Sequence, residues 1–235
     1  SSVSPQTDLS EDLKFVKLRM FYMGELFDLF LSQDRGAEYI TEIREINVSN
    51  FIQAAKGNII YYTIHERDFG SVKKKLLLSN LSKENGKLNE IIDDAIKIDC
   101  LNDRFKTYET VLFLCLQEML KNAIKKNFWS AKQPQIIIEY KANKKNRTIS
   151  VTNKIDPLKN RRIKKIMKMS DAFTKDGEMP EEGFGHRLMQ GYAKLLNGKL
   201  YVNDMWLDKR LIDIAIQNKE ELKFKLTLEF PVFSI

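Results

Sequence analysis

The sequence of 235 residues predicts an α+β fold, in which helices pack on one face of a mostly antiparallel sheet and a helical hairpin precedes them. Alternating apolar and polar residues indicate strands at 135–141, 148–153 and 222–230. Apolar residues at three- and four-residue steps indicate long helices at 11–32 and 37–66. Two such helices joined by a short turn cannot close a core alone, so we expect a homodimer in which two hairpins form a four-helix bundle.

The predicted domains follow from these elements. They are a dimerising helical hairpin at 1–68, a basic linker with Ser, Asn and Gly at 69–86, and an α+β domain at 87–235. Further helices are expected at 87–99, from about 108, at 161–169 and at 187–196, the last ended by Asn197-Gly198. Further strands are expected at 199–203 and 210–217, the latter because Ile212, Ile214 and Ile216 alternate with other residues. The polar segment 170–182 is expected to form a mobile loop.

One helical segment carries a polar stripe inside apolar surroundings. Glu118, Asn122 and Lys125 follow at spacings of four and three within 112–128, so they project from one side of a helix. A carboxylate can position or deprotonate a water, a carboxamide oxygen suits Mg²⁺, and an ammonium can reach a phosphate. The stripe therefore predicts either a nucleoside triphosphate pocket or the solvated face of an amphipathic helix, and spacing alone does not choose between them.

Two motifs extend this pattern. EMLKNAIKK at 118–126 resembles the N box of the histidine-kinase-like ATPase superfamily, which includes sensor histidine kinases, and GFGHRL at 183–188 resembles its second glycine box, in the form found in the HWE branch of histidine kinases. The resemblance implies that Asn122 coordinates Mg²⁺ and that Glu118 acts as a base or positions a water. It also implies that the glycine box, at the start of a helix, holds the phosphates of ATP, and that 170–182 is the lid over the nucleotide. The candidate nucleotide-binding residues are Asn122, Lys125, Asn153, Gly183, Gly185, His186, Arg187 and Leu188.

The sequence departs from the family at two places. Asn153 stands where the family has the Asp that reads the adenine amino group, and no glycine follows at Lys154 or Ile155. A carboxamide can still accept from an amino group, but without the charge that strengthens such a bond. The family's phosphoacceptor His is also missing, because Gly24 stands at its expected place, so His65 is the remaining candidate ahead of the N box.

Composition narrows the remaining possibilities. The net charge of +7 is spread along the chain with acidic residues interspersed, which favours a solvated basic surface over a nucleic-acid partner. Cys100 and Cys115 are too few for a disulfide framework and are expected to be reduced thiols in the cytoplasm. No apolar run approaches the roughly 20 residues of a membrane span.

Two functional hypotheses follow. In the first, the chain is a histidine-kinase-like signalling protein that binds ATP and Mg²⁺ and docks a response regulator or partner kinase, as a degenerate kinase or adaptor. In the second, it is an active ATPase or histidine kinase that phosphorylates His65 or another protein. The retained N box favours nucleotide binding, whereas the absent His favours lost phosphotransfer.

Overall fold

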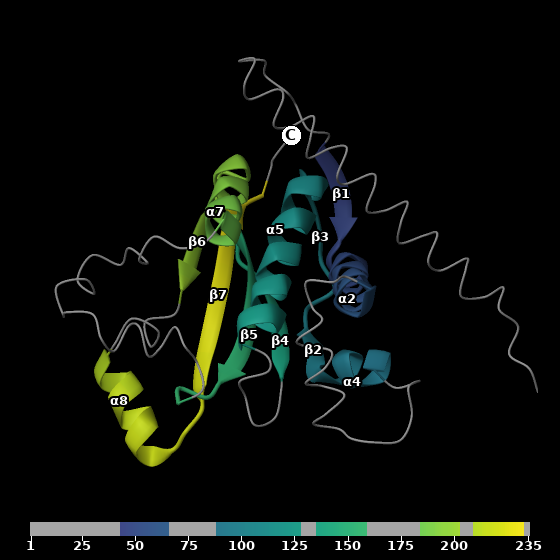
Figure 1. The fold of residues 1–235 in the computed structure, drawn as a ribbon. Coiled ribbons are helices and arrows are strands. Elements are labelled where there is room, and N and C mark those ends of the chain that lie inside the picture. The colour runs from purple at the N-terminus through teal and green to yellow at the C-terminus, as the bar shows by residue number, and fades with distance from the viewer. Residues whose placement is uncertain (1–42, 66–87, 128–134, 159–183, 203–208, 233–235) are drawn as a thin grey trace, which may run out of the picture.

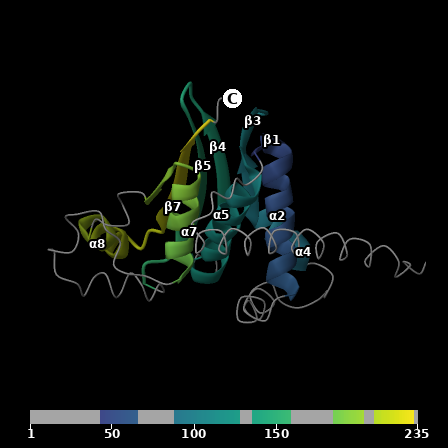
Figure 2. The ribbon, with the colours of Figure 1, turned by 90° about the horizontal axis from the view of Figure 1, so that it is seen from above.

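The computed structural model describes residues 43–65, 88–127, 135–158, 184–202 and 209–232. They form a sheet covered on one face by a layer of helices (Figures 1 and 2). The sheet has the strand order β2-β4-β5-β7-β6, with β2 parallel to β4 and the other pairs antiparallel. Its strands are β2 (Ile96–Asp99), β4 (Ile136–Ala142), β5 (Asn146–Ile155), β6 (Lys199–Val202) and β7 (Leu222–Pro231). The described part of the chain is therefore α+β with a mostly antiparallel sheet, as the sequence predicts.

The hairpin of β4 and β5 confirms the strands predicted at 135–141 and 148–153. Its turn is set by Asn143, whose side-chain oxygen accepts hydrogen bonds from the backbone amides of Lys145 (2.9 Å) and Asn146 (2.6 Å). Asn favours such turns because its side chain can replace a backbone acceptor. The central strand β5 then pairs with β7 along its whole length.

Three helices cover the sheet in the spatial order α7, α5, α2 (Figure 2). They are α2 (Val48–His65), α5 (Glu109–Asn122) and α7 (Phe184–Leu195), and the short π-helix η2 (Ala123–Asn127) continues α5. Phe51 of α2 packs edge-on against Phe113 of α5, with ring centroids 5.9 Å apart, and one turn further Gln117 of α5 donates to the carbonyl of Ala55. Equal steps along both helices mean that α2 and α5 run in the same direction.

The expected helix at 37–66 is wrong in its first part. Residues Ile43–Asn47 form strand β1, which pairs antiparallel with β3 (Arg104–Tyr108) in a small second sheet. The helix begins only after Asn47, because the Asn47 side-chain oxygen accepts from the backbone amide of Asn50 at 3.1 Å, as a helix N-cap does. Three- and four-residue spacing of apolar residues continued through this boundary and hid it. Residues 48–65 are helical, as predicted.

The inner face of α2 is covered within the chain itself. Ile52, Ala55 and Ile59 are fully buried and belong to the same hydrophobic cluster as the apolar residues of α5 and the sheet. The argument that this helix needs a second copy of the chain to cover it is therefore wrong. The first helix of the expected hairpin, at 11–32, and the linker at 69–86 lie outside the described residues, so the division into domains stays a prediction.

Two further elements differ from the sequence predictions. Residues Lys209–Asn218 form helix α8 instead of a strand: Ile212 and Ala215, three residues apart, are buried, while Ile214 is 48% exposed. The isoleucines at every second position predict a strand. The buried side chains, however, are three residues apart, which is the spacing of a helix. The segment 87–99, expected as one helix, is α4 (Leu88–Ala95) followed by β2, and β3 was not predicted. The helix expected at 161–169 and the loop at 170–182 lie outside the described residues.

The end of α7 confirms the predicted stop at Asn197-Gly198. Asn197 has a positive φ of 51°, and the amides of Asn197 and Gly198 donate to the carbonyls of Lys194 and Ala193. This is the pattern of a helix closed by a left-handed residue. A Cβ on Gly198 would lie 2.3 Å from the carbonyl oxygen of Glu229 on β7, so the tight passage from α7 into β6 needs glycine. Among the described helices none is long and apolar enough to cross a membrane.

Candidate functional site

The polar stripe on α5 lies where the sequence predicts it. Glu118 and Asn122 are partly exposed, whereas Cys115, Met119 and Leu120 on the other faces of the same helix are buried. Lys125 is also partly exposed, but it belongs to η2, where the wider π-helical turn follows the regular helix. π-Helical turns inside or after α-helices are frequent at functional sites. The stripe is thus open on a helix that is otherwise enclosed.

Asn122 faces the helix that carries the second glycine box. Its Nδ2 donates to the Sδ of Met189 on α7 at 3.7 Å, and the Cys115 thiol donates to the Met189 carbonyl at 3.9 Å. Met189 directly follows the glycine box in sequence. Asn122 of the N box therefore contacts the helix that begins in the glycine box. Asn122 and Gly183 are 61 residues apart in the sequence.

Glu118 lies next to the same contact. It makes an ion pair with Lys121 at 3.1 Å, and the Lys121 ammonium also lies 5.6 Å from the ring centroid of Tyr62 on α2. The negative charge of Glu118 also reaches Tyr192 on α7: burial raises the pKa of the Tyr192 phenol, and the charge of Glu118 raises that pKa further. The carboxylate thus lies between the helices on either side of α5, close enough to α7 to act on its groups.

Asn153 is the most unusual polar residue near this region. It lies on β5 between Ile136 and Phe224 of the neighbouring strands, and it is only 2% exposed. Neither atom of its carboxamide has a hydrogen-bond partner among the described residues. Leaving such a buried donor and acceptor unsatisfied costs about 1–3 kcal/mol per group. The arrangement therefore calls for a ligand or a bound water at Asn153.

The segment after Asn153 contains a residue that the motif analysis passed over. Asp156 is buried, and its carboxylate accepts from the backbone amide of Leu158 at 2.9 Å, which closes the Asp-Pro turn at the end of β5. The sequence signal was the Asp-Pro-Leu triplet itself, since Asp commonly caps its own turn. Lys154 and Ile155, where the resemblance implies the first glycines, still belong to β5, so this turn comes just after that place.

The glycine box is placed in part. The backbone of Gly185, His186 and Arg187 forms the first turn of α7, and the side chain of Leu188 packs partly buried against the core. Gly183 lies outside the described residues. Because α7 begins at Phe184, the free amides of its first turn lie at the helix end where an anion is favoured, as the motif predicts.

The ends of the three helices also coincide. Asn122, the last residue of α5, contacts Met189 in the first half of α7, so the end of α5 lies beside the start of α7. The end of α2 lies beside the same end of α5, because the Tyr62 ring of α2 is 5.6 Å from the ammonium of Lys121. His65, as the last residue of α2, belongs to this end.

No protein-family model and no curated protein matches the sequence. Solved structures that resemble the chain include histidine kinase AdeS of Acinetobacter baumannii (10% identity, TM-score 0.49, covering 99% of this chain and 88% of that one). They also include the catalytic domain of histidine kinase ThkA in a nucleotide-free form (14%, 0.47, 81% and 97%) and the mycobacterial sensor histidine kinase MprB (12%, 0.41, 82% and 100%). All three neighbours are histidine kinases.

The residues present fit an ATP–Mg²⁺ site. The Nδ2 of Asn122 donates to Met189. The Oδ1 of Asn122 is the atom that suits a hard cation. The partnerless carboxamide of Asn153 can both donate to and accept from an adenine edge. No group of three or more His, Cys, Asp or Glu side chains in the described residues could hold a metal alone, so a cation here would rely on phosphate oxygens and water as further ligands.

Proposed function

We propose that this chain is a histidine-kinase-like signalling protein that binds ATP with Mg²⁺ between α5 and α7. The observation that carries the proposal is the meeting of Asn122 with Met189, which joins the N-box helix to the glycine-box helix. Two motifs with complementary ligand chemistry, for a cation and for phosphates, come together at one end of the helix layer. An ordinary amphipathic helix would have no reason to direct its polar stripe at this partner.

In this proposal each residue has a defined task. Asn122 Oδ1 binds the cation, the first-turn amides of α7 hold the phosphates, and Asn153 reads the purine from β5. Lys125, on the widened turn, supplies a mobile positive charge to a phosphate. Bound Mg²⁺ would neutralise phosphate charge and fix the geometry of the triphosphate. Lys121 holds one carboxylate oxygen of Glu118, and the other oxygen can position a water.

Calorimetric titration of the full chain with ATP, with and without Mg²⁺, tests the site. We expect Mg²⁺-dependent binding that Asn122→Asp weakens about tenfold or more, because an added negative charge lies beside the phosphates; tenfold corresponds to about 1.4 kcal/mol. Asn218→Asp is the matched control, since Asn218 is exposed at the end of α8, and it should bind as the wild type does. No binding of any nucleotide by the wild type would refute the proposal.

Asn153 provides a second, independent test of the same site. If its carboxamide reads the purine, Asn153→Ala should reduce the preference for ATP over GTP, whereas the Mg²⁺ dependence stays. Asn153→Asp restores the residue of the family and should strengthen ATP binding, because hydrogen bonds to a charged acceptor are roughly twice as strong as neutral ones. Unchanged base preference in both variants would place the purine elsewhere.

We further propose that the protein works as a degenerate kinase or adaptor that docks a response regulator or a partner kinase. Gly24 occupies the expected place of the phosphoacceptor, so no imidazole is available there for phosphotransfer. Incubation with ATP labelled at the γ-phosphate should leave no acid-labile phosphate on residues 1–64. Gly24→His is the converse test, and a gain of label would show that the ATP site is competent and only the acceptor is absent.

One observation favours the active alternative, in which His65 accepts the phosphate. His65 ends α2 one turn after Tyr62, whose ring lies 5.6 Å from the ammonium of Lys121 in the N box. In this case the wild type should become labelled, and His65→Ala should abolish the label while ATP binding stays. Label that survives His65→Ala would exclude both His65 and the degenerate kinase.

A homodimer stays part of the proposal, with a changed location. Because the inner face of α2 packs on α5, the dimer would depend on the segment before residue 43, which lies outside the described residues. Light scattering should show a dimer for the full chain and a monomer for a fragment that begins at Thr41. A dimeric fragment would move the interface to the described domain.

A further inference from the structure

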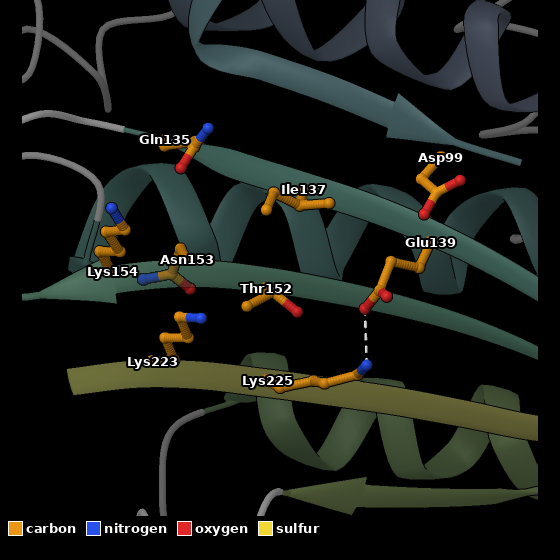
Figure 3. A pocket seen from close by; sticks show the side chains of 9 residues that line it. All are labelled: Asp99, Gln135, Ile137, Glu139, Thr152, Asn153, Lys154, Lys223 and Lys225. Carbon is orange, nitrogen blue, oxygen red and sulfur yellow. Dashed lines mark hydrogen bonds and ion pairs between the residues drawn. The ribbon is translucent and has the colours of Figure 1, made fainter.

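The face of the sheet opposite the helices carries a cavity of about 550 Å³. Figure 3 shows its lining side chains rising from β2, β4, β5 and β7, with α5 behind the sheet. Most of these strand residues alternate in sequence with residues that point into the core. Ile137 and Thr152 therefore form the floor of the cavity, while the buried Ile136 and Ile138 point toward the helices. The volume lies within the roughly 300–1,000 Å³ typical of small-molecule sites. The lining residues are Asp99, Gln135, Ile137, Glu139, Thr152, Asn153, Lys154, Lys223 and Lys225.

The two ends of this cavity carry opposite charge. At one end Lys154 and Lys223 are direct cross-strand partners on β5 and β7, with the Gln135 carboxamide nearby (Figure 3). At the other end Asp99 and Glu139 are direct partners on β2 and β4. Like charges directly opposite each other destabilise a sheet. Gln135 and Glu139 are four residues apart on β4, which corresponds to roughly 13 Å between the ends.

Part of the acidic end is already compensated. The Lys225 ammonium contacts the Glu139 carboxylate at 2.5 Å, and this hydrogen bond is the main cause that lowers the pKa of Glu139. Glu139 therefore stays an anion and an acceptor. Asp99 next to it is exposed, so its carboxylate can accept from a ligand.

Between the two ends lies a hydroxyl without a partner. Thr152 is the register partner of both Ile137 and Lys225, and its Oγ1 is buried with no hydrogen bond among the described residues. A buried hydroxyl normally has a partner, because leaving it unsatisfied is costly. Thr152 lines the middle of the cavity, where a polar group of a ligand can supply the partner.

We propose that this cavity binds a phosphate monoester of a small polyhydroxylated molecule, such as a sugar phosphate. Lys154 and Lys223 hold the phosphate, and the hydroxyl groups donate to Asp99 and Glu139. The Thr152 hydroxyl bonds to the middle of the ligand. The cavity lies on the opposite face of the sheet from α5 and α7, and of its lining residues only Asn153 is also assigned to the proposed ATP site. A ligand of this kind places an anion beside the two lysines and hydroxyl donors beside the two carboxylates, which neither free phosphate nor a neutral sugar can do.

Calorimetry of the full chain with three probes tests this site: glucose 6-phosphate, inorganic phosphate and glucose. We expect saturable binding of glucose 6-phosphate, at least tenfold weaker binding of inorganic phosphate, and no measurable binding of glucose. Equal affinity for glucose 6-phosphate and inorganic phosphate would overturn the proposal, because the acidic end and Thr152 would then contribute nothing.

Variants locate the binding. Lys154→Ala with Lys223→Ala should weaken glucose 6-phosphate binding at least tenfold, and Asp99→Asn should weaken it several-fold without affecting inorganic phosphate. Lys199→Ala is the matched control, because Lys199 is exposed on β6 outside the cavity, and it should bind normally. If the double variant unfolds, Asp99→Asn decides alone. Binding that is lost in Asn122→Asp but kept in the lysine and Asp99 variants would assign the probe to the ATP site and overturn the proposal.

Discussion

Helix α5 has two flanks that differ in character. On one flank it packs against α2, whose Ile52, Ala55 and Ile59 are fully buried. Phe51 of α2 also contacts the ring of Phe113 of α5 there. Toward α7 it presents Asn122 and the charge of Glu118 beside buried residues. One helix thus separates a contact built for stability from one that can bind a ligand. Polar groups are tolerated on the α7 flank because they lie near the end of the helix layer, where they are only partly buried.

The largest expected effect is on folding when α2 is removed. A fragment that begins at Ser71 lacks Phe51, Ile52 and Ile59, whose burial contributes roughly 5–9 kcal/mol, comparable with the whole stability of a typical domain. It should therefore show no cooperative thermal transition by circular dichroism. A fragment that begins at Thr41 retains β1 and α2 and should unfold cooperatively. Equal folding of both fragments would show that the α2 flank is dispensable.

Single substitutions on the two flanks should separate stability from binding. Ile52→Ala empties a fully buried site and should destabilise the protein by about 2–5 kcal/mol in urea unfolding, with ATP affinity unchanged below the transition. Ile214→Ala, at a residue 48% exposed on α8, is the control and should change stability by less than about 1 kcal/mol. Asn122→Asp should show the reverse profile, with a small change in stability and weak binding. If folded Ile52→Ala lost as much ATP affinity as Asn122→Asp, the two flanks of α5 would not have separate roles in stability and binding.

The start of α2 is fixed by a charged cluster whose contribution should depend on pH. Asp103 accepts from the Tyr140 hydroxyl (2.5 Å), Arg147 Nε (2.9 Å) and the Arg104 amide (2.8 Å), while its own carbonyl accepts from the Val48 amide at 3.0 Å. Burial opposes ionisation, but the hydrogen bonds from Tyr140 and the Arg104 amide, together with Arg147, outweigh it and lower the pKa of Asp103.

Asp103→Asn should therefore destabilise the protein by about 1–3 kcal/mol at pH 7. A carboxyl whose pKa is lowered on folding stabilises the folded state above its unfolded pKa, and this contribution disappears as the pH falls through the folded value. The difference in the free energy of unfolding between wild type and Asp103→Asn should accordingly become smaller below about pH 4, near the ordinary pKa of Asp. Urea unfolding at pH 7, 5 and 3 measures it, and a difference that does not vary with pH would contradict the role of the charge.

The smallest effect concerns the packing of α5 on α7. Burial raises the pKa of the Cys115 thiol to about 12, and Glu118 adds to the rise, so Cys115 should react with iodoacetamide far more slowly than the half-buried Cys100. Mass spectrometry of timed reactions at pH 8 gives both rates. ATP with Mg²⁺ should slow Cys115 further by holding α5 and α7 together, and Asn122→Asp should remove that effect. Equal rates for both cysteines would mean that this contact opens readily.

The sequence by itself determined the parts of the fold in which local pattern and burial agree. Apolar residues that recur every second position predict the strands β4, β5 and β7, and residues that recur at the helical period predict the polar stripe of α5. In these segments the tertiary structure keeps the conformation that the local pattern favours. The glycine box at the start of α7 and the helix stop at Asn197 also follow from local chemistry, since both depend on backbone groups near in sequence.

Only the tertiary structure decided which surfaces meet. Ile43–Asn47 is a strand because β3 lies beside it, and α8 is a helix because Ile212 and Ala215 pack on one side, although both segments are compatible with the other period. The orphaned carboxamide of Asn153 and the two charge pairs around the open cavity depend on strand register. For these residues register joins positions from 17 apart (Ile136 and Asn153) to 71 apart (Asn153 and Phe224), and no local pattern contains that information.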